Sequence, residues 1–286
     1  MSGSEPLFLA STPDLDRVRR PNRVGPHDRS ASVSHRGSLC YQFDGADRSS
    51  CGLRQPAWAS DLSMMNSMIE YYERRAQEYD AIYDRAQVKS DLRELGRWLQ
   101  DHVRDLTVLE VACGTGYWTS IAAASARSIL ATDYNPAPLA IARAKGLGAN
   151  VRLERADAYA LPDYPLHFEC GMAHLWWSHV CKREQAAFLS QFASKLLPGA
   201  KLLMIDNNFV SGSTAISRVD DDGNSYQLRS LRNGEQYEVL KNFPSAEDLE
   251  RALGSFCSDV RIRELEYFWA VSARFPDASR FNARRS

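Results

Sequence analysis

Between residues 107 and 206 the chain alternates short apolar runs with amphipathic segments, and this alternation restricts the fold more than any other feature. The runs typical of buried strands are 107–112, 128–133, 151–156, 168–174 and 201–206. Helix-like segments separate them at 117–126, 138–145 and 182–196, the last ending before a Pro-Gly stop signal. Short strands that alternate with amphipathic helices form a parallel sheet covered on both faces.

The pattern changes after residue 206. The run "SYQLRSLRNGEQYEV" has two alternating segments around Asn233-Gly234, the strongest short-range hairpin signal. A helix at 246–253 and two closing strands at 260–267 and 268–275 follow. We therefore expect an α/β fold: a Rossmann-like, seven-stranded, mostly parallel sheet with helices on both faces. A β-hairpin insertion at 209–243, after the fifth strand, either roofs a pocket or forms a homodimer contact.

The N-terminal part divides into two segments. Residues 1–60 are rich in Arg, Ser, Pro and Gly without helical or strand periodicity, so we expect a disordered tail, or translated sequence upstream of a start near Met64 or Met65. From Met64, aromatic and apolar side chains recur at helical spacing, and a second amphipathic helix covers 90–103. Residues 61–103 are thus predicted to form a helical cap on a domain spanning 61–286.

Bulk properties exclude several classes of protein. Charged residues make up 25% of the 286-residue chain and the formal net charge is −1, so nothing global favours nucleic acid or an anionic membrane. No apolar stretch approaches the roughly 20 residues of a membrane span. The six cysteines form no C-x-x-C pair and no zinc spacing. We predict a reduced, cytoplasmic protein that binds no nucleic acid.

The first strand ends in a distinctive turn, "TVLEVACGTGYWT", with an acid inside the strand and a Gly-x-Gly after it. Glycines here allow backbone to approach a ligand, and ligands bind at the carboxyl ends of parallel strands. The turn lacks the Gly-Lys-Ser/Thr of a phosphate-binding loop, and Thr119 stands where a dinucleotide fingerprint has a third small residue.

The acid-x-x-x-Gly-x-Gly pattern resembles motif I of class I S-adenosylmethionine-dependent methyltransferases. "ATDYNPAPL", "ADAYALP" and "FLSQFASKLLPGAKLLMID" follow in the family's order, and "YYERRAQEYD" resembles the N-terminal cap of the ubiquinone- and menaquinone-pathway type. The resemblance implies S-adenosylmethionine as cofactor and methyl transfer to a small molecule, aromatic or amphipathic. The cofactor-binding residues that it implies are Glu110, Ala112, Gly114, Gly116, Asp133, Tyr134, Asp157, Ala158 and Tyr79.

Within that set, each polar residue has an expected role. Glu110 anchors the cofactor's ammonium through water or the glycine loop. Asp133 accepts both ribose hydroxyls, and Asp157 with the Ala158 amide contacts adenine. Each aspartate also has a purely structural interpretation, because Asp133 and Asp157 both precede turns that they could cap.

Acceptor-side residues are expected after the fourth and fifth strands and on the cap. In "AHLWWSHV", His174 or His179 is a candidate general base, with a helix cap, or catalysis by proximity alone, as the alternatives. The predicted substrate-binding residues are Trp176, Trp177, Tyr72 and Asn207. Asp206-Asn207 resembles the Asp-Asn pair of metal-dependent catechol methyltransferases, but the fourth strand does not end in a carboxylate, so no metal is predicted.

Two other functions remain open on this fold. A dinucleotide-dependent oxidoreductase can use the same glycine turn, although Thr119 and Glu110 argue against it. The other is a non-catalytic S-adenosylmethionine-binding module, which would need no acceptor site. The aromatic residues beside the predicted cofactor site argue against such a module.

Overall fold

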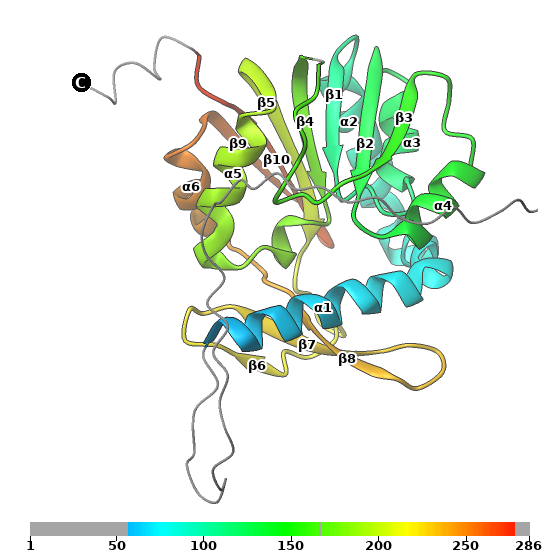
Figure 1. Ribbon diagram of the computed structural model, residues 1–286, viewed down its shortest axis with the longest axis vertical. Coiled ribbons are helices and arrows are strands. Elements are labelled where there is room, and N and C mark those ends of the chain that lie inside the picture. The colour runs from blue at the N-terminus through cyan, green and yellow to red at the C-terminus, as the bar shows by residue number, and fades with distance from the viewer. Residues whose placement is uncertain (1–56, 166, 278–286) are drawn as a thin grey trace, which may run out of the picture. The chain divides into compact units, whose positions relative to one another are not determined.

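A seven-stranded sheet organises the protein, whose computed structural model describes residues 57–165 and 167–277. Its strands are β1 (Thr107–Val111), β2 (Ser128–Asp133), β3 (Val151–Arg155), β4 (Phe168–His174), β5 (Leu196–Asn207), β9 (Ser258–Glu264) and β10 (Phe268–Arg274). The order is β3-β2-β1-β4-β5-β10-β9, and β10 runs antiparallel to both of its neighbours (Figure 1). The predicted Rossmann-like sheet is confirmed, including the two closing strands.

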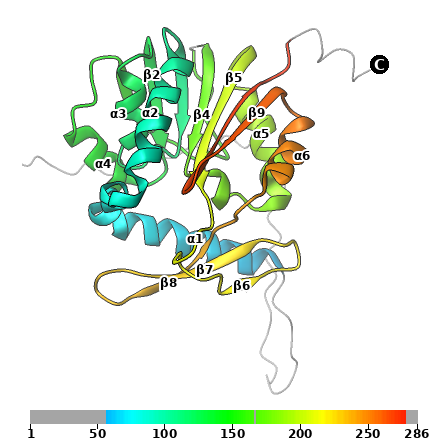
Figure 2. The same cartoon turned by 180° about the vertical axis from the view of Figure 1, so that it is seen from behind.

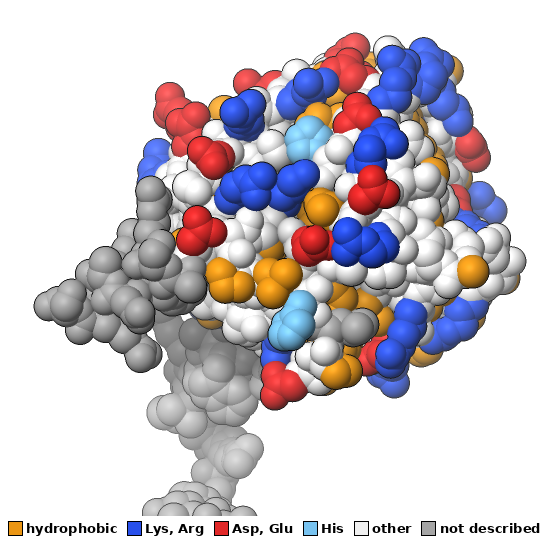
Figure 3. All heavy atoms as spheres, turned by 90° about the horizontal axis from the view of Figure 1, so that it is seen from above, with side chains coloured by type: hydrophobic (Ala, Val, Ile, Leu, Met, Phe, Trp, Pro, Cys, Tyr) orange, Lys and Arg blue, Asp and Glu red, His pale blue; other side chains and the backbone are white. Residues whose placement is uncertain are grey.

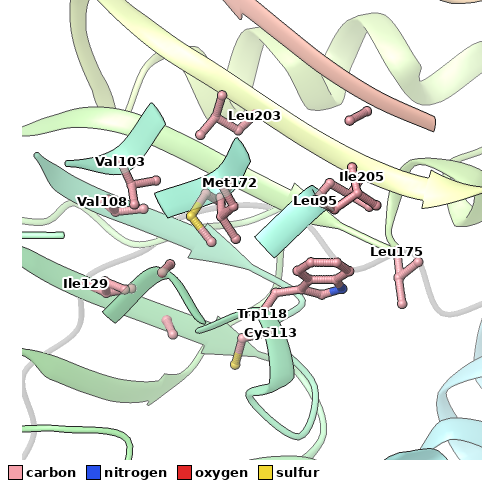
Figure 4. Packing of buried hydrophobic residues seen from close by; sticks show 14 of the residues in the cluster. Leu95, Val103, Val108, Cys113, Trp118, Ile129, Met172, Leu175, Leu203 and Ile205 are labelled. Atoms are coloured by element: carbon pink, nitrogen blue, oxygen red, sulfur yellow. The ribbon is translucent and has the colours of Figure 1, made fainter. Parts of the chain in front are cut away.

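Helices cover both faces of this sheet because side chains alternate along each strand. In β1, Val108 packs with α2 (Lys89–Val103) and α3 (Tyr117–Ala123), whereas its neighbour Leu109 packs with α5 (Gln185–Ala193) and α6 (Ala246–Gly254). Helix α2 is nearer the viewer in Figure 2. Figure 4 shows side chains of the α2 and α3 cluster, among them Leu95, Met172 and Trp118. A further helix, α4 (Pro136–Ala144), follows β2.

The cap consists of a helix that changes type along its length. Helix α1 (Ala57–Arg75) continues as the 3₁₀ helices η1 (Ala76–Asp84) and η2 (Ala86–Val88). The helical spacing of "SMIEYYERRAQEYDAIYD", residues 67–84, predicted one continuous helix, so the change at Arg75 is a correction. In Figures 1 and 2, α1 crosses below the carboxyl ends of the parallel strands.

The insertion after β5 forms a small antiparallel sheet. Its strands are β6 (Arg218–Val219), β7 (Ser225–Ser230) and β8 (Gln236–Leu240). The β7–β8 hairpin confirms the prediction from Asn233-Gly234, and Gly234 has a φ of 89°. Strand β6 was not foreseen. The insertion packs on α1, where the Tyr71 and Tyr237 ring centroids are 5.8 Å apart.

Some predicted boundaries differ from the observed ones. The helix expected at 182–196 divides into η4 (Lys182–Glu184) and α5, and β5 already begins at Leu196. A separate short helix, η3 (Trp177–His179), precedes it. Most of the expected tail, residues 1–56, lies outside the described residues, whereas 57–60 belong to α1.

The face above the amino ends of the parallel strands carries interspersed acidic and basic side chains (Figure 3). Within the two described ranges, no helix combines the length and the apolar character that crossing a membrane requires.

Candidate functional site

The turn after β1 uses its two glycines for different purposes. Ala112, Gly114 and Gly116 have φ values of 52°, 56° and 77°, a region that L side chains rarely adopt. A Cβ on Gly114 would meet nothing within 4 Å, whereas one on Gly116 would lie 2.8 Å from Leu147 Cδ1. Gly114 therefore leaves space open beside the turn, and Gly116 permits close packing.

These glycines should separate binding from stability. We expect Gly114→Ala to weaken binding of S-adenosylhomocysteine roughly tenfold, because a methyl group enters the open space. Gly116→Ala should instead lower the free energy of unfolding by about 2 kcal/mol, because backbone strain and overpacking add. Calorimetry and urea denaturation measure the two effects. Gly146→Ala, with φ 62° and no close neighbour, is the control for strain alone. Equal loss of affinity in Gly114→Ala and Gly146→Ala would contradict this assignment.

Asp133 ends β2 beside this turn with its carboxylate held by backbone donors. Gly114 N donates to Oδ2 and Asn135 N donates to Oδ1, each at 2.8 Å. Burial raises the pKa of the Asp133 carboxyl from its ordinary value, and the two amide bonds oppose that shift. Each oxygen retains a lone pair for a ligand hydroxyl.

A cavity of about 570 Å³, here called the strand-end cavity, opens at this point. Its surface is mostly apolar, and α1 and η1 contribute part of its wall. The residues predicted from the sequence that line it are Ala112, Gly114, Asp133, Tyr134, Asp157, Ala158, Tyr79, Tyr72, Trp176 and His179. The structure thus brings most of the predicted cofactor set to one place.

Glu110 and Gly116 do not line either of the two described cavities. The Glu110 side chain is buried on the α3 side of β1, where its Oε2 accepts a hydrogen bond from Thr119 Oγ1 at 2.7 Å. Burial raises the pKa of Glu110 to about 7. The Glu110 carboxylate thus makes an internal bond that joins β1 to α3, and its contact with a ligand ammonium stays a prediction.

Two residues of the "AHLWWSHV" segment lie in the core rather than at a cavity. Trp177 is buried against Phe188, with ring centroids 6.4 Å apart. His174 packs edge-on against Trp118, and both its ring nitrogens are buried with no hydrogen-bond partner among the described residues. Burial lowers the pKa of His174 to about 3, so it is neutral. The predicted roles of Trp177 in substrate binding and of His174 as base have no geometric support.

His174→Leu is therefore expected to stabilise the protein. An unfolded chain protonates this histidine below about pH 6.5, while the folded chain resists protonation down to about pH 3, so native stability is lost as pH falls between them. The gain of the variant should be about 2 kcal/mol larger at pH 5 than at pH 7. Urea denaturation at both pH values measures it. Exposed His167→Leu serves as control, and an equal gain there would contradict burial as the cause.

A second cavity of about 630 Å³, the cap cavity, is enclosed by α1, η1, the insertion and the loop after β5. It contains the predicted Asn207 and shares Tyr72, Tyr79, Leu175 and His179 with the strand-end cavity. Five basic residues that were not predicted from the sequence also line it: Arg75, Arg85, Arg229, Arg232 and Lys241. Only the helical phase of Arg75, one turn after Tyr72, gave any signal for them.

His179 and Tyr72 form a pair at the junction of the two cavities. His179 Nδ1 lies 2.6 Å from the Leu240 carbonyl oxygen, and Nε2 lies 2.9 Å from Tyr72 Oη. Because a carbonyl only accepts, Nδ1 carries the proton and Nε2 accepts from the tyrosine hydroxyl. Burial lowers the pKa of His179 to about 3, so the ring is a neutral acceptor across physiological pH.

Beneath this pair lies a buried ion pair. Lys241 Nζ donates to Asp206 Oδ1 at 2.8 Å, and the two side chains are 3% and 0% exposed. Ser178 N and Asn207 N also donate to Asp206. These hydrogen bonds occupy Asp206 and Asn207, the pair that resembles a metal-binding motif. Within the described ranges, no group of three or more His, Cys, Asp or Glu side chains is arranged to hold a metal ion.

Comparison with known proteins defines the class. Residues 108–199, which include the glycine turn and Asp133, match the family model of a methyltransferase domain. Residues 108–199 are thus similar to a methyltransferase domain, and the order of the sheet that contains them agrees with the class I S-adenosylmethionine-dependent methyltransferases that the sequence resembles. The narrower ubiquinone/menaquinone type remains a prediction.

Individual relatives agree with that class. A probable S-adenosylmethionine-dependent methyltransferase of Mycolicibacterium smegmatis is 29% identical over 153 residues, so this chain spans about half the length of the curated relative it matches (54%, against 52% of this chain). The structure of a DhpI–SAH complex is 25% identical with a TM-score of 0.62, covering 74% of this chain and 97% of that one. A Burkholderia thailandensis 1,6-didemethyltoxoflavin-N1-methyltransferase shares the fold, at 15% identity and a TM-score of 0.51, over 80% and 94% of the two chains.

Proposed function

We propose that this protein transfers a methyl group from S-adenosylmethionine in the strand-end cavity to a small molecule in the cap cavity. The observation that carries the proposal is the junction between them, where Tyr72, Tyr79, Leu175 and His179 line both cavities. A reaction between two bound molecules requires such adjacency, because aligning the reacting atoms supplies much of the rate enhancement.

The residues of the strand-end cavity fit S-adenosylmethionine. Asp133 offers two carboxylate lone pairs for ribose hydroxyls, and the space beside Gly114 admits the methionine portion. Ala158 and Asp157 line the part of the cavity nearest β3, suited to a purine. When bound, S-adenosylmethionine supplies a methyl group activated by a positively charged sulfur. A 25%-identical protein that forms an SAH complex supports this assignment.

The chain's own groups at the junction suit the acceptor step. S-adenosylmethionine held in the strand-end cavity would supply its methyl carbon to an acceptor lone pair, and the electron pair of the carbon–sulfur bond would stay on sulfur. Where the acceptor atom carries a proton, the Tyr72 hydroxyl and His179 Nε2 form a hydrogen-bonded relay at the junction through which it leaves. Because the pKa of His179 is about 3, the ring passes the proton on rather than retaining it. The rings of Tyr72, Tyr79 and Phe243 provide contact for an aromatic or amphipathic acceptor.

The first test is calorimetric titration with S-adenosylhomocysteine, with transfer of labelled methyl groups from S-adenosylmethionine to a broad acceptor panel. Micromolar binding and a labelled product are expected. Binding of a nicotinamide cofactor instead would favour the oxidoreductase. Binding of S-adenosylhomocysteine with no product across the panel would favour the binding module. Light scattering tests the predicted homodimer, and fractionation of the source cells tests the cytoplasmic location.

A further inference from the structure

The cap cavity has an excess of positive charge. Five cationic side chains line it, and Glu78 is its one acidic lining residue. The five are Arg75, Arg85, Arg229, Arg232 and Lys241. Two of them have carboxylate partners, since Lys241 pairs with Asp206 and Arg232 with Glu78 at 3.3 Å. The other three have no carboxylate within ion-pair distance in the described part of the chain.

Arg75, the last residue of α1, is half-buried at this cavity. Its guanidinium carbon lies 5.5 Å from the Tyr71 ring centroid and 5.4 Å from that of Tyr79. Stacking of this kind holds the guanidinium plane but leaves its N–H groups available for another acceptor. The residue before it, Arg74, is exposed and pairs with Glu70 and Glu235 outside the cavity.

Arg229 reaches the same cavity from strand β7. Its Nη2 and Nε donate to Gln227 Oε1 at 2.6 and 3.2 Å, so its orienting partner is neutral. The charges of Arg229 and Arg75 converge on Tyr72, because both act to lower the pKa of that hydroxyl, which burial raises to about 12. Two half-buried guanidiniums that line one cavity, with no carboxylate paired to either of them in the described ranges, favour the binding of an anion.

We propose that the acceptor carries an oxyanion, a carboxylate or phosphate group, bound between Arg75 and Arg229 in the cap cavity. Guanidinium groups bind both anions in bidentate fashion. Bound there, the anion leaves the rest of the acceptor beside Tyr72 and His179, at the junction with the strand-end cavity. This inference rests on the proposed function, because it takes the bound anion to be part of a methyl acceptor. The anion site itself does not require catalysis.

Inorganic phosphate and malonate, titrated into the full chain by calorimetry, test the site directly. We expect saturable binding of at least one probe, weakened roughly tenfold by Arg75→Gln and by Arg229→Gln. Arg74→Gln is the matched control and should bind as wild type does. Arg75→Lys keeps the charge and should bind more tightly than Arg75→Gln, which separates lost charge from a damaged fold. The preferred probe distinguishes phosphate from carboxylate.

No saturable binding of either probe, or binding that both glutamine variants leave within twofold of wild type, would overturn the inference. S-adenosylhomocysteine binding is measured on the same variants and should not change, because neither arginine lines the strand-end cavity. A wild-type protein that binds phosphate but not S-adenosylhomocysteine would contradict the proposed function and still support the anion site. With turnover, Arg75→Gln should raise KM for an acid at least about tenfold more than for its amide.

Discussion

Asp133→Ala is expected to weaken S-adenosylhomocysteine binding at least about a hundredfold, because two charge-assisted hydrogen bonds to the ribose are lost together. The Asp133 carboxylate is already positioned by Gly114 N and Asn135 N, so the wild-type protein loses little side-chain entropy when the ligand binds. Calorimetry measures the change. Asp133→Asn, which keeps the shape and one acceptor oxygen, should lose less than the alanine variant.

The control for Asp133→Ala is Asp163→Ala, an exposed acid that pairs with Lys195 away from both cavities. It should leave the dissociation constant unchanged. An Asp133→Ala protein that is folded by circular dichroism and binds S-adenosylhomocysteine as wild type does would show that Asp133 only caps the turn before Asn135.

Asp206→Ala should lower the free energy of unfolding by about 3–5 kcal/mol, since it leaves the Lys241 ammonium buried without its partner. Urea denaturation at pH 7 measures the loss. The double variant Asp206→Ala/Lys241→Met removes both charges and should recover a large part of it. A double variant no more stable than Asp206→Ala would show that the backbone bonds to Asp206, rather than the ion pair, provide the stability.

The same pair predicts an acid dependence. Burial acts to raise the pKa of Asp206, but Lys241 opposes it strongly enough to hold the pKa below its ordinary value. A folded pKa below the unfolded value, about 3.9, means that this contribution is full above that pH and lost as pH falls through the folded pKa. Wild type should therefore lose stability below about pH 4 more steeply than the double variant does.

The sequence predicted the sheet well because period-two burial and strong turn signals are local properties. It also placed Asp133, Gly114 and Asp157 at one edge, since the carboxyl ends of parallel strands meet there. The internal bond of Glu110 was not foreseen, because its partner is the Thr119 hydroxyl on another element. His174 was misjudged for a similar reason, because only packing against Trp118 shows that it faces the core.

The basic side of the cap cavity was beyond sequence analysis. Arg75 comes from α1, Arg229 comes from β7 and Lys241 is the residue directly after β8, and these segments approach one another only when the insertion packs on the cap. An arginine on a helix or hairpin is usually a solvated surface residue, and its lack of a carboxylate partner is visible only in three dimensions. The change from α1 to η1 at Arg75 was equally hidden, because the aromatic spacing continues through it.

The placement of the insertion also has an evolutionary consequence. Asp133 of the strand-end cavity ends β2, and Ala112, Gly114 and Asp157 lie in the turns after β1 and β3. The basic residues of the cap cavity come instead from the cap and from the insertion after β5. The strand ends and the cap with its insertion can thus evolve at different rates. The strand ends must keep binding the same cofactor, whereas the cap and the insertion can change to bind new acceptors. Transplanting the insertion together with its cap is the natural route to retargeting such a scaffold.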